Sequence, residues 1–146
     1  MKIKYFVLGF FALGIGLLVF NNLKSTQQDP HSVQSTSGDQ GAALVQVVVP
    51  ELTGRAEAGR LAFEVNCASC HGVNAAGKDG VAPPLVHIIY EPNHHSDISF
   101  QRAAKNGVKA HHWRFGNMPP VPGITDNEIS LITNYVRELQ RANGIF

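Results

Sequence analysis

The stretch Cys67-Ala68-Ser69-Cys70-His71 holds both cysteines of this 146-residue chain and places a histidine directly after the second one. A disulfide framework is excluded, because two cysteines cannot staple a domain extensively and these two are only three positions apart. The spacing therefore indicates chemistry at one local site. Two cysteines at this spacing commonly form a redox-active pair or supply half of a zinc site. A histidine directly after the second cysteine is typical of a third use, covalent attachment of haem.

Haem attachment is the use that the rest of the sequence favours. A thioredoxin-like redox pair is expected beside a βαβ pattern, which the chain lacks, and a finger-like zinc site needs a second Cys/His pair although no further cysteine exists. Two thiols at this spacing can each reach one vinyl group of the same porphyrin, and the next residue then places its imidazole under the iron. The motif predicts one covalent haem c, attached to Cys67 and Cys70, with His71 as an axial ligand.

Met118 is the predicted second axial ligand. Apart from Met1 it is the only methionine of the chain, and it lies in the loop Gly116-Asn117-Met118-Pro119-Pro120. A lone methionine usually fills a gap in a core, but this one does not lie on an apolar helical face. The prolines that follow restrict where its sulfur can point. Ligation by histidine and methionine raises the potential of a haem.

Five histidines after the motif offer alternatives to this assignment: His87, His94, His95, His111 and His112. Any of them could ligate the iron and give a bis-histidine haem of lower potential. The doublets His94-His95 and His111-His112 could instead bind copper or zinc through their imidazoles. We interpret most of these histidines as exposed loop residues, with a second metal site as the alternative.

Residues 1–23 are predicted to form a membrane anchor. No ionisable side chain occurs in residues 6–23, and this length just suffices for a helix that crosses a bilayer. No A-x-A-like cleavage site follows, so we interpret the segment as an uncleaved signal anchor, with a cleaved signal peptide as the alternative. Lys2 and Lys4 precede the apolar run and only Lys24 follows it closely, which predicts a cytoplasmic N-terminus.

The rest of the chain is then exported as a tether and one domain. Residues 24–50 begin with a segment rich in Ser, Thr and Gln, which predicts a flexible tether. Residues 42–49, which end it, are expected to form an extended arm on the domain of residues 51–146. We expect a single-pass protein of the inner (cytoplasmic) membrane whose domain faces the periplasm. A net charge of +1 argues against a nucleic-acid partner.

Helical patterns predict an all-α domain of three to five helices with long loops. The first helix starts after the N-cap Thr53 and runs into Cys67. A short helix is expected over residues 99–106, ending at Gly107. The last helix opens with the capping box Thr125-Asp126-Asn127-Glu128 and carries one apolar stripe. Glycines and prolines punctuate the segments between these helices, which indicates loops.

The haem motif, the methionine loop and the predicted first and last helices together resemble the class I c-type cytochromes, which are small electron carriers with one haem. Gly59 and Phe63 lie eight and four residues before Cys67, where the family has a glycine and an aromatic residue on its first helix. Ile132 and Tyr135 match positions on the last helix that cross them. The resemblance implies a small cytochrome c-like domain folded around one covalent haem, in which Gly59 lets the two helices approach closely.

The resemblance also implies roles for two loop residues. Pro83 lies in a segment that looks like the family's proline loop, and its carbonyl would accept the Nδ1 proton of His71. Trp113 is placed as in small bacterial members, where the indole donates to a haem propionate. Plain packing in the haem pocket is the alternative for this tryptophan. Met118 with its two prolines matches the methionine loop, whereas residues 86–109 carry no motif of the family.

The predicted function is electron transfer by a carrier that is not an enzyme and takes no small-molecule substrate. Its expected partners are respiratory or periplasmic redox proteins. The alternative is a haem c subunit of a larger membrane-bound dehydrogenase or oxidase complex. A peroxidatic enzyme would need an open iron position, and the histidine doublets leave a copper-handling protein as a further rival. Four basic residues near the methionine loop are candidates for a rim that docks an acidic partner: Arg102, Lys105, Lys109 and Arg114.

Overall fold

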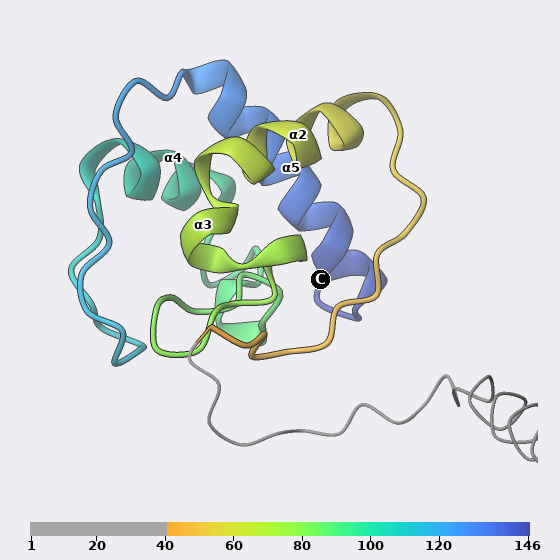
Figure 1. The fold of residues 1–146 in the computed structure, drawn as a ribbon. Helices are drawn as coiled ribbons and strands as arrows, with labels where there is room; N and C mark the ends of the chain where they lie inside the picture. The colour runs from red at the N-terminus through yellow and green to blue at the C-terminus, as the bar shows by residue number, and fades with distance from the viewer. Residues whose placement is uncertain (1–40) are drawn as a thin grey trace, which may run out of the picture. The chain divides into compact units, whose positions relative to one another are not determined.

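Residues 41–146 are described by the structure, which is a computed structural model. The anchor expected at residues 1–23 and the first part of the tether lie outside the described residues. Among the residues described, no helix is long and apolar enough to cross a membrane. Figure 1 shows the helices of this part joined by long loops.

Four α-helices and two short 3-10 turns make up the regular structure of this part. The helices are α2 (Gly54–Asn66), α3 (Ala68–His71), α4 (Asp97–Asn106) and α5 (Asp126–Ala142). The turns are η2 (Val73–Ala75) and η3 (Ile88–Tyr90). Residues 41–146 contain two isolated β-bridges and no strand. The predicted all-α class, with three to five helices and long loops, is confirmed for these residues.

Helices α2 and α5 cross at a glycine (Figure 1). A Cβ atom at Gly59 would lie 2.0 Å from the carbonyl oxygen of Leu131, so a larger residue cannot occupy this position without moving a helix. Beside the crossing, the rings of Phe63 and Tyr135 pack with centroids 5.5 Å apart, and both side chains are buried. Ile132 is buried in the same core. The close approach expected from the resemblance is confirmed.

The start of α5 is fixed by the predicted capping box. The Thr125 side chain accepts from the Glu128 N–H at 3.2 Å, and the Glu128 carboxylate accepts from the Thr125 N–H at 2.8 Å. The Thr125 hydroxyl also donates to the Glu128 carboxylate at 2.6 Å, and this bond, with the one from the Thr125 N–H, lowers the pKa of Glu128 because both favour its ionised form. Thr53 is the N-cap of α2, as predicted, but its side chain makes no capping hydrogen bond.

The end of α4 brings the methionine loop close to that helix. The helix begins at Asp97, two residues earlier than predicted, and ends before Gly107 as expected. Gly107 has φ +73°, a conformation that favours glycine. A Cβ atom there would lie 2.5 Å from the carbonyl oxygen of Met118. Glycine at this position therefore allows the two backbones to approach.

The segment before α2 lies extended against the domain, in the place expected for the arm. Its backbone bonds first to the loop after α3, where the Leu44 N–H donates to the Ala76 carbonyl at 3.0 Å. It then reaches the end of α5, where Val48 exchanges two hydrogen bonds with the Asn143 side chain, at 2.9 and 2.8 Å. Figure 1 shows this segment in orange and yellow, running from one side of the domain to the other.

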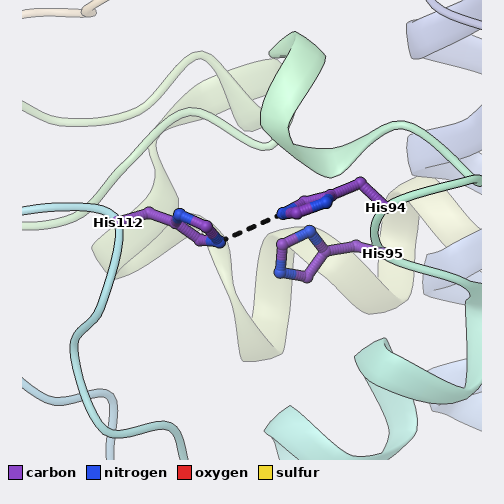
Figure 2. A group of neighbouring side chains, drawn as sticks. All are labelled: His94, His95 and His112. Atoms are coloured by element: carbon purple, nitrogen blue, oxygen red, sulfur yellow. Dashed lines mark hydrogen bonds between the residues drawn. The ribbon is translucent and has the colours of Figure 1, made fainter.

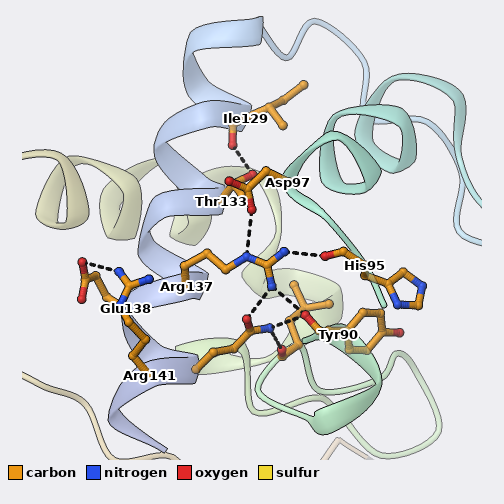
Figure 3. A network of polar contacts seen from close by, with 10 residues as sticks. Tyr90, His95, Asp97, Ile129, Thr133, Arg137, Glu138 and Arg141 are labelled. Carbon is orange, nitrogen blue, oxygen red and sulfur yellow. Dashed lines mark hydrogen bonds and ion pairs between the residues drawn. The ribbon is translucent and has the colours of Figure 1, made fainter. Parts of the chain in front are cut away.

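A buried polar network fixes the middle of the chain to α5 (Figure 3). Arg137 is 6% exposed and donates to the Tyr90 carbonyl at 2.7 Å, to the Asp97 carboxylate at 2.9 Å and to the His95 carbonyl. Gln140 accepts from Arg137 at 2.6 Å and donates to the Tyr90 carbonyl at 3.0 Å. Sequence reasoning assigned no role to these side chains, which hold an irregular segment in one conformation.

Candidate functional site

A cavity of about 420 Å³ lies between α3, α4, α5 and the loops that join them. Its wall is mainly apolar. All six residues predicted to bind the haem line it: Cys67, Cys70, His71, Pro83, Trp113 and Met118. The fold therefore brings together residues that lie more than fifty positions apart in the chain. The volume falls within the usual range for cofactor sites, roughly 300–1,000 Å³.

His71 is held in the orientation that an axial ligand needs. It ends α3, is 9% exposed, and its Nδ1 lies 2.9 Å from the Pro83 carbonyl oxygen. Because a carbonyl only accepts, Nδ1 carries the proton and Nε2 keeps its lone pair. Burial lowers the pKa of His71, and the bond to Pro83 partly opposes that change. The side chain is therefore neutral at physiological pH, which is the form that binds a metal.

The two cysteines lie one helical turn apart beside the cavity. Cys67 separates α2 from α3 and its N–H donates to the Phe63 carbonyl at 2.8 Å, while Cys70 is exposed. Burial and the neighbouring Cys70 sulfur raise the pKa of Cys67 to about 11. A thiolate is disfavoured at this position, whereas the uncharged thioether formed on haem attachment carries no such cost.

Met118 enters the cavity from a loop whose backbone is paired. Its N–H donates to the Val108 carbonyl at 3.0 Å, and its carbonyl accepts from the Val108 N–H at 2.9 Å. In the same loop the Asn117 side chain accepts from the Ala110 N–H at 2.9 Å. These bonds hold the backbone of Met118 and the side chain of the residue before it. The thioether of Met118 and the imidazole of His71 line one cavity.

Trp113 carries a buried donor that has no acceptor within residues 41–146. Its ring packs against His87 and Phe115, with centroids 5.1 and 5.9 Å away. Tyr90 lines the same cavity, and burial raises the pKa of its hydroxyl. A buried N–H without an acceptor costs about 1–3 kcal/mol. A haem propionate would supply that acceptor, so the residues of the cavity fit a haem c.

The rival histidines fall into two groups. His87 accepts from the Ile89 N–H at 3.2 Å and so caps η3, which uses one of its ring nitrogens. His95, His111 and His112 line the same cavity as Met118, and His94 lies beside them. Most of these histidines are exposed, as interpreted from the sequence, but four of them gather in one place. The sequence offered the two doublets as an alternative metal site, and the structure brings members of both doublets together.

Of the four basic residues predicted to form a rim, one is engaged in an ion pair and three are exposed. Lys105 pairs with Asp126 at the start of α5. Arg102, Lys109 and Arg114 are exposed, and Arg102 lines the cavity.

Tyr90 and Phe100 also line the cavity, but the sequence did not predict this because the segment that contains them carries no motif.

Comparison with known proteins agrees with this site. The family model described as Cytochrome c matches residues 56–140 of the chain. Proteins of that family bind haem c covalently, and Cys67 and Cys70 have the spacing of its attachment motif. The predicted cofactor is thereby confirmed. A search of curated proteins found no match.

Proposed function

The chain belongs to the cytochrome c family, and from that premise we propose that it carries single electrons with His71 and Met118 as the axial ligands of its haem. The observation that carries this proposal is the shared cavity, in which a neutral, oriented imidazole and a thioether on a paired loop both line the wall. The haem c supplies a one-electron iron couple when bound. With both axial positions filled by the chain, no substrate reaches the iron, which supports a carrier rather than an enzyme.

The chain's own residues keep the site constant during electron transfer. Pro83 holds the tautomer and the ring orientation of His71, and the bridge between Val108 and Met118 holds the thioether loop. The mainly apolar wall excludes water, so few dipoles need to reorient when the charge changes. The indole N–H of Trp113, which has no acceptor within residues 41–146, would orient a haem propionate.

We place this domain on the periplasmic side of the inner membrane, anchored by residues 1–23. The support is the distribution of lysines around the apolar run and the haem attachment motif that follows it. Residues 41–49 are bonded to the domain itself, so the proposed tether is limited to residues 24–40. The proposed partners are redox proteins within reach of that tether.

Absorption spectra of the oxidised and reduced full-length holoprotein test the ligation. The ferric wild type is expected to show the iron–sulfur charge-transfer band, and Met118→Ala is expected to lose it and to bind cyanide. The reduction potential of this variant should fall, because the thioether that favours reduced iron is gone. His95→Ala and His112→Ala are matched controls from the same cavity and should keep the band. A wild type without the band, or its loss only in a histidine variant, contradicts Met118 as the ligand.

A further inference from the structure

Three histidines from two loops meet beside the haem cavity (Figure 2). His94 and His95 follow η3, and His112 lies in the loop that leads to Met118. One ring nitrogen from each can be chosen so that all three lie within 4.8 Å of one another. The Nε2 atoms of His94 and His112 are 3.3 Å apart and share a hydrogen bond (Figure 2).

We propose that His94, His95 and His112 form a binding site for a divalent transition metal ion of the zinc and copper class. Imidazole nitrogens suit these ions. In a tetrahedral zinc site with bonds of about 2.0–2.1 Å, two ligand nitrogens lie roughly 3.3–3.4 Å apart. The separation of His94 and His112 already has this value. Three imidazoles leave a fourth position for water or another ligand.

Hydrogen bonds orient His95 for this role before any metal arrives. Its Nδ1 lies 2.6 Å from the Ile89 carbonyl oxygen and therefore carries the proton, which leaves Nε2 as the free ligand atom. A carbonyl that receives the other ring N–H is the usual support of a histidine metal ligand. The backbone of His95 is also held, because Arg137 donates to its carbonyl.

Apolar burial does not explain why these rings gather. His94 and His112 are exposed and His95 is half-buried, yet the rings of His94 and His95 are 4.7 Å apart and those of His94 and His112 are 5.3 Å apart. Local desolvation and neighbouring histidines lower the pKa of His112. This change favours the neutral imidazole of His112, which is the form that binds a metal. An ion held by all three rings gives this arrangement a stabilising contact.

A metal here would join two loops and place positive charge at the haem cavity. It would link the segment that Arg137 fixes to the loop that carries Met118. His95 and His112 both line the cavity, so a bound cation favours the electron-rich, reduced haem by Coulomb attraction. The reduction potential of the haem should therefore rise when the site is filled.

Zinc titration of the full-length ferric holoprotein, prepared without an affinity tag, tests the site. Elemental analysis should find zinc equimolar with haem iron. Calorimetry should show that His94→Ala and His112→Ala each weaken binding at least about tenfold. His111→Gln is the matched control, because its ring lies 4.2 Å from that of His112 but outside the three. This control should change the affinity by less than about twofold.

Two further readouts separate this site from the haem ligation. Electron paramagnetic resonance of bound Cu²⁺ should show nitrogen couplings that weaken in His112→Ala. Zinc should raise the haem potential in the wild type and in His111→Gln but not in His94→Ala or His112→Ala. Neither requires Met118 on the iron, so the metal site and the axial ligation can fail independently. The exposed histidines can be replaced without unfolding, which the haem spectrum verifies. Zinc well below one per haem, equal affinity in the single variants, or the same loss in His111→Gln overturns the proposal.

Discussion

The two sides of α5 are built from different chemistry. Toward α2, the helix presents Ile132 and Tyr135 and makes an apolar crossing around Gly59. Toward the middle of the chain, it presents Arg137 and Gln140, whose polar atoms bind backbone carbonyls and a carboxylate. The first side joins two regular helices. The second side holds a segment that is mostly irregular. Its contacts come from the polar side chains of Arg137 and Gln140, and in a helical sequence pattern such side chains look like solvent-exposed ones.

The difference teaches which parts of a small domain can be derived from periodicity. The apolar stripe of α5 follows from its helical periodicity, whereas the contact of Gly59 and Phe63 with that helix came from the resemblance and is present in the structure. A charged residue within a helical pattern is usually solvated, and Arg137 is buried only because the folded segment supplies its acceptors. The two sides should therefore respond differently to substitution.

The largest expected effect is at the apolar crossing. In Gly59→Ala the new methyl group would lie 2.0 Å from the Leu131 carbonyl oxygen and 2.9 Å from Tyr135 Cβ, so the helices must separate. We expect the free energy of unfolding, measured by urea denaturation of the holoprotein, to fall by about 3–4 kcal/mol. The loss occurs although alanine favours helix over glycine by about 1 kcal/mol.

The reverse exchange at the neighbouring position is the control. Ala58 is exposed on the same helix, so Ala58→Gly should cost only the difference in helix propensity, about 1 kcal/mol. If Gly59→Ala were as stable as the wild type, the crossing would tolerate a side chain and its close approach would not be needed.

The polar side should give a smaller and more local loss. Arg137→Met keeps the unbranched, apolar part of the side chain but removes the guanidinium donors to Tyr90, His95 and Asp97. Buried acceptors left without a donor should lower the free energy of unfolding by about 2–3 kcal/mol. Hydrogen exchange should accelerate mainly in residues 85–97, because the crossing with α2 is untouched.

Arg141→Met is the matched change on the same helix. Arg141 pairs with Glu138 at 2.6 Å but its side chain is 48% exposed, and an exposed pair of this kind contributes only about 0–1 kcal/mol. Exchange that accelerates equally throughout the domain in Arg137→Met would show that the network supports the whole fold rather than the middle segment.

The residues of the candidate site also differ in how far the sequence predicts them. Cys67, Cys70 and His71 form one local motif, and Met118 was distinguished by being alone in a proline-bounded loop, so the sequence alone pointed to each. The contact of His71 with Pro83 came from the resemblance and is present in the structure. The resemblance to a family therefore predicted a contact that no local sequence motif indicates.

The sequence suggested the histidine doublets as an alternative metal site but did not predict which of their rings meet. His94 and His112 lie eighteen positions apart in loops without a regular pattern, so their approach depends on how both loops fold. One of those loops is placed by Arg137, which binds the His95 carbonyl, and the other by the bridge at Met118. Convergence of this kind follows from tertiary structure, because no local rule fixes the path of either loop.

The smallest expected effect lies at the start of α5, which both of its sides share. Thr125→Ala removes the hydroxyl that accepts from the Glu128 N–H, and loss of such a cap lowers the free energy of unfolding by about 1 kcal/mol. Thr125→Ser keeps the oxygen and should restore most of that stability. Because the cap lies upstream of both the crossing and the network, hydrogen exchange should accelerate to a similar degree on the two sides. A change confined to one side would mean that they do not depend on α5 as a single unit.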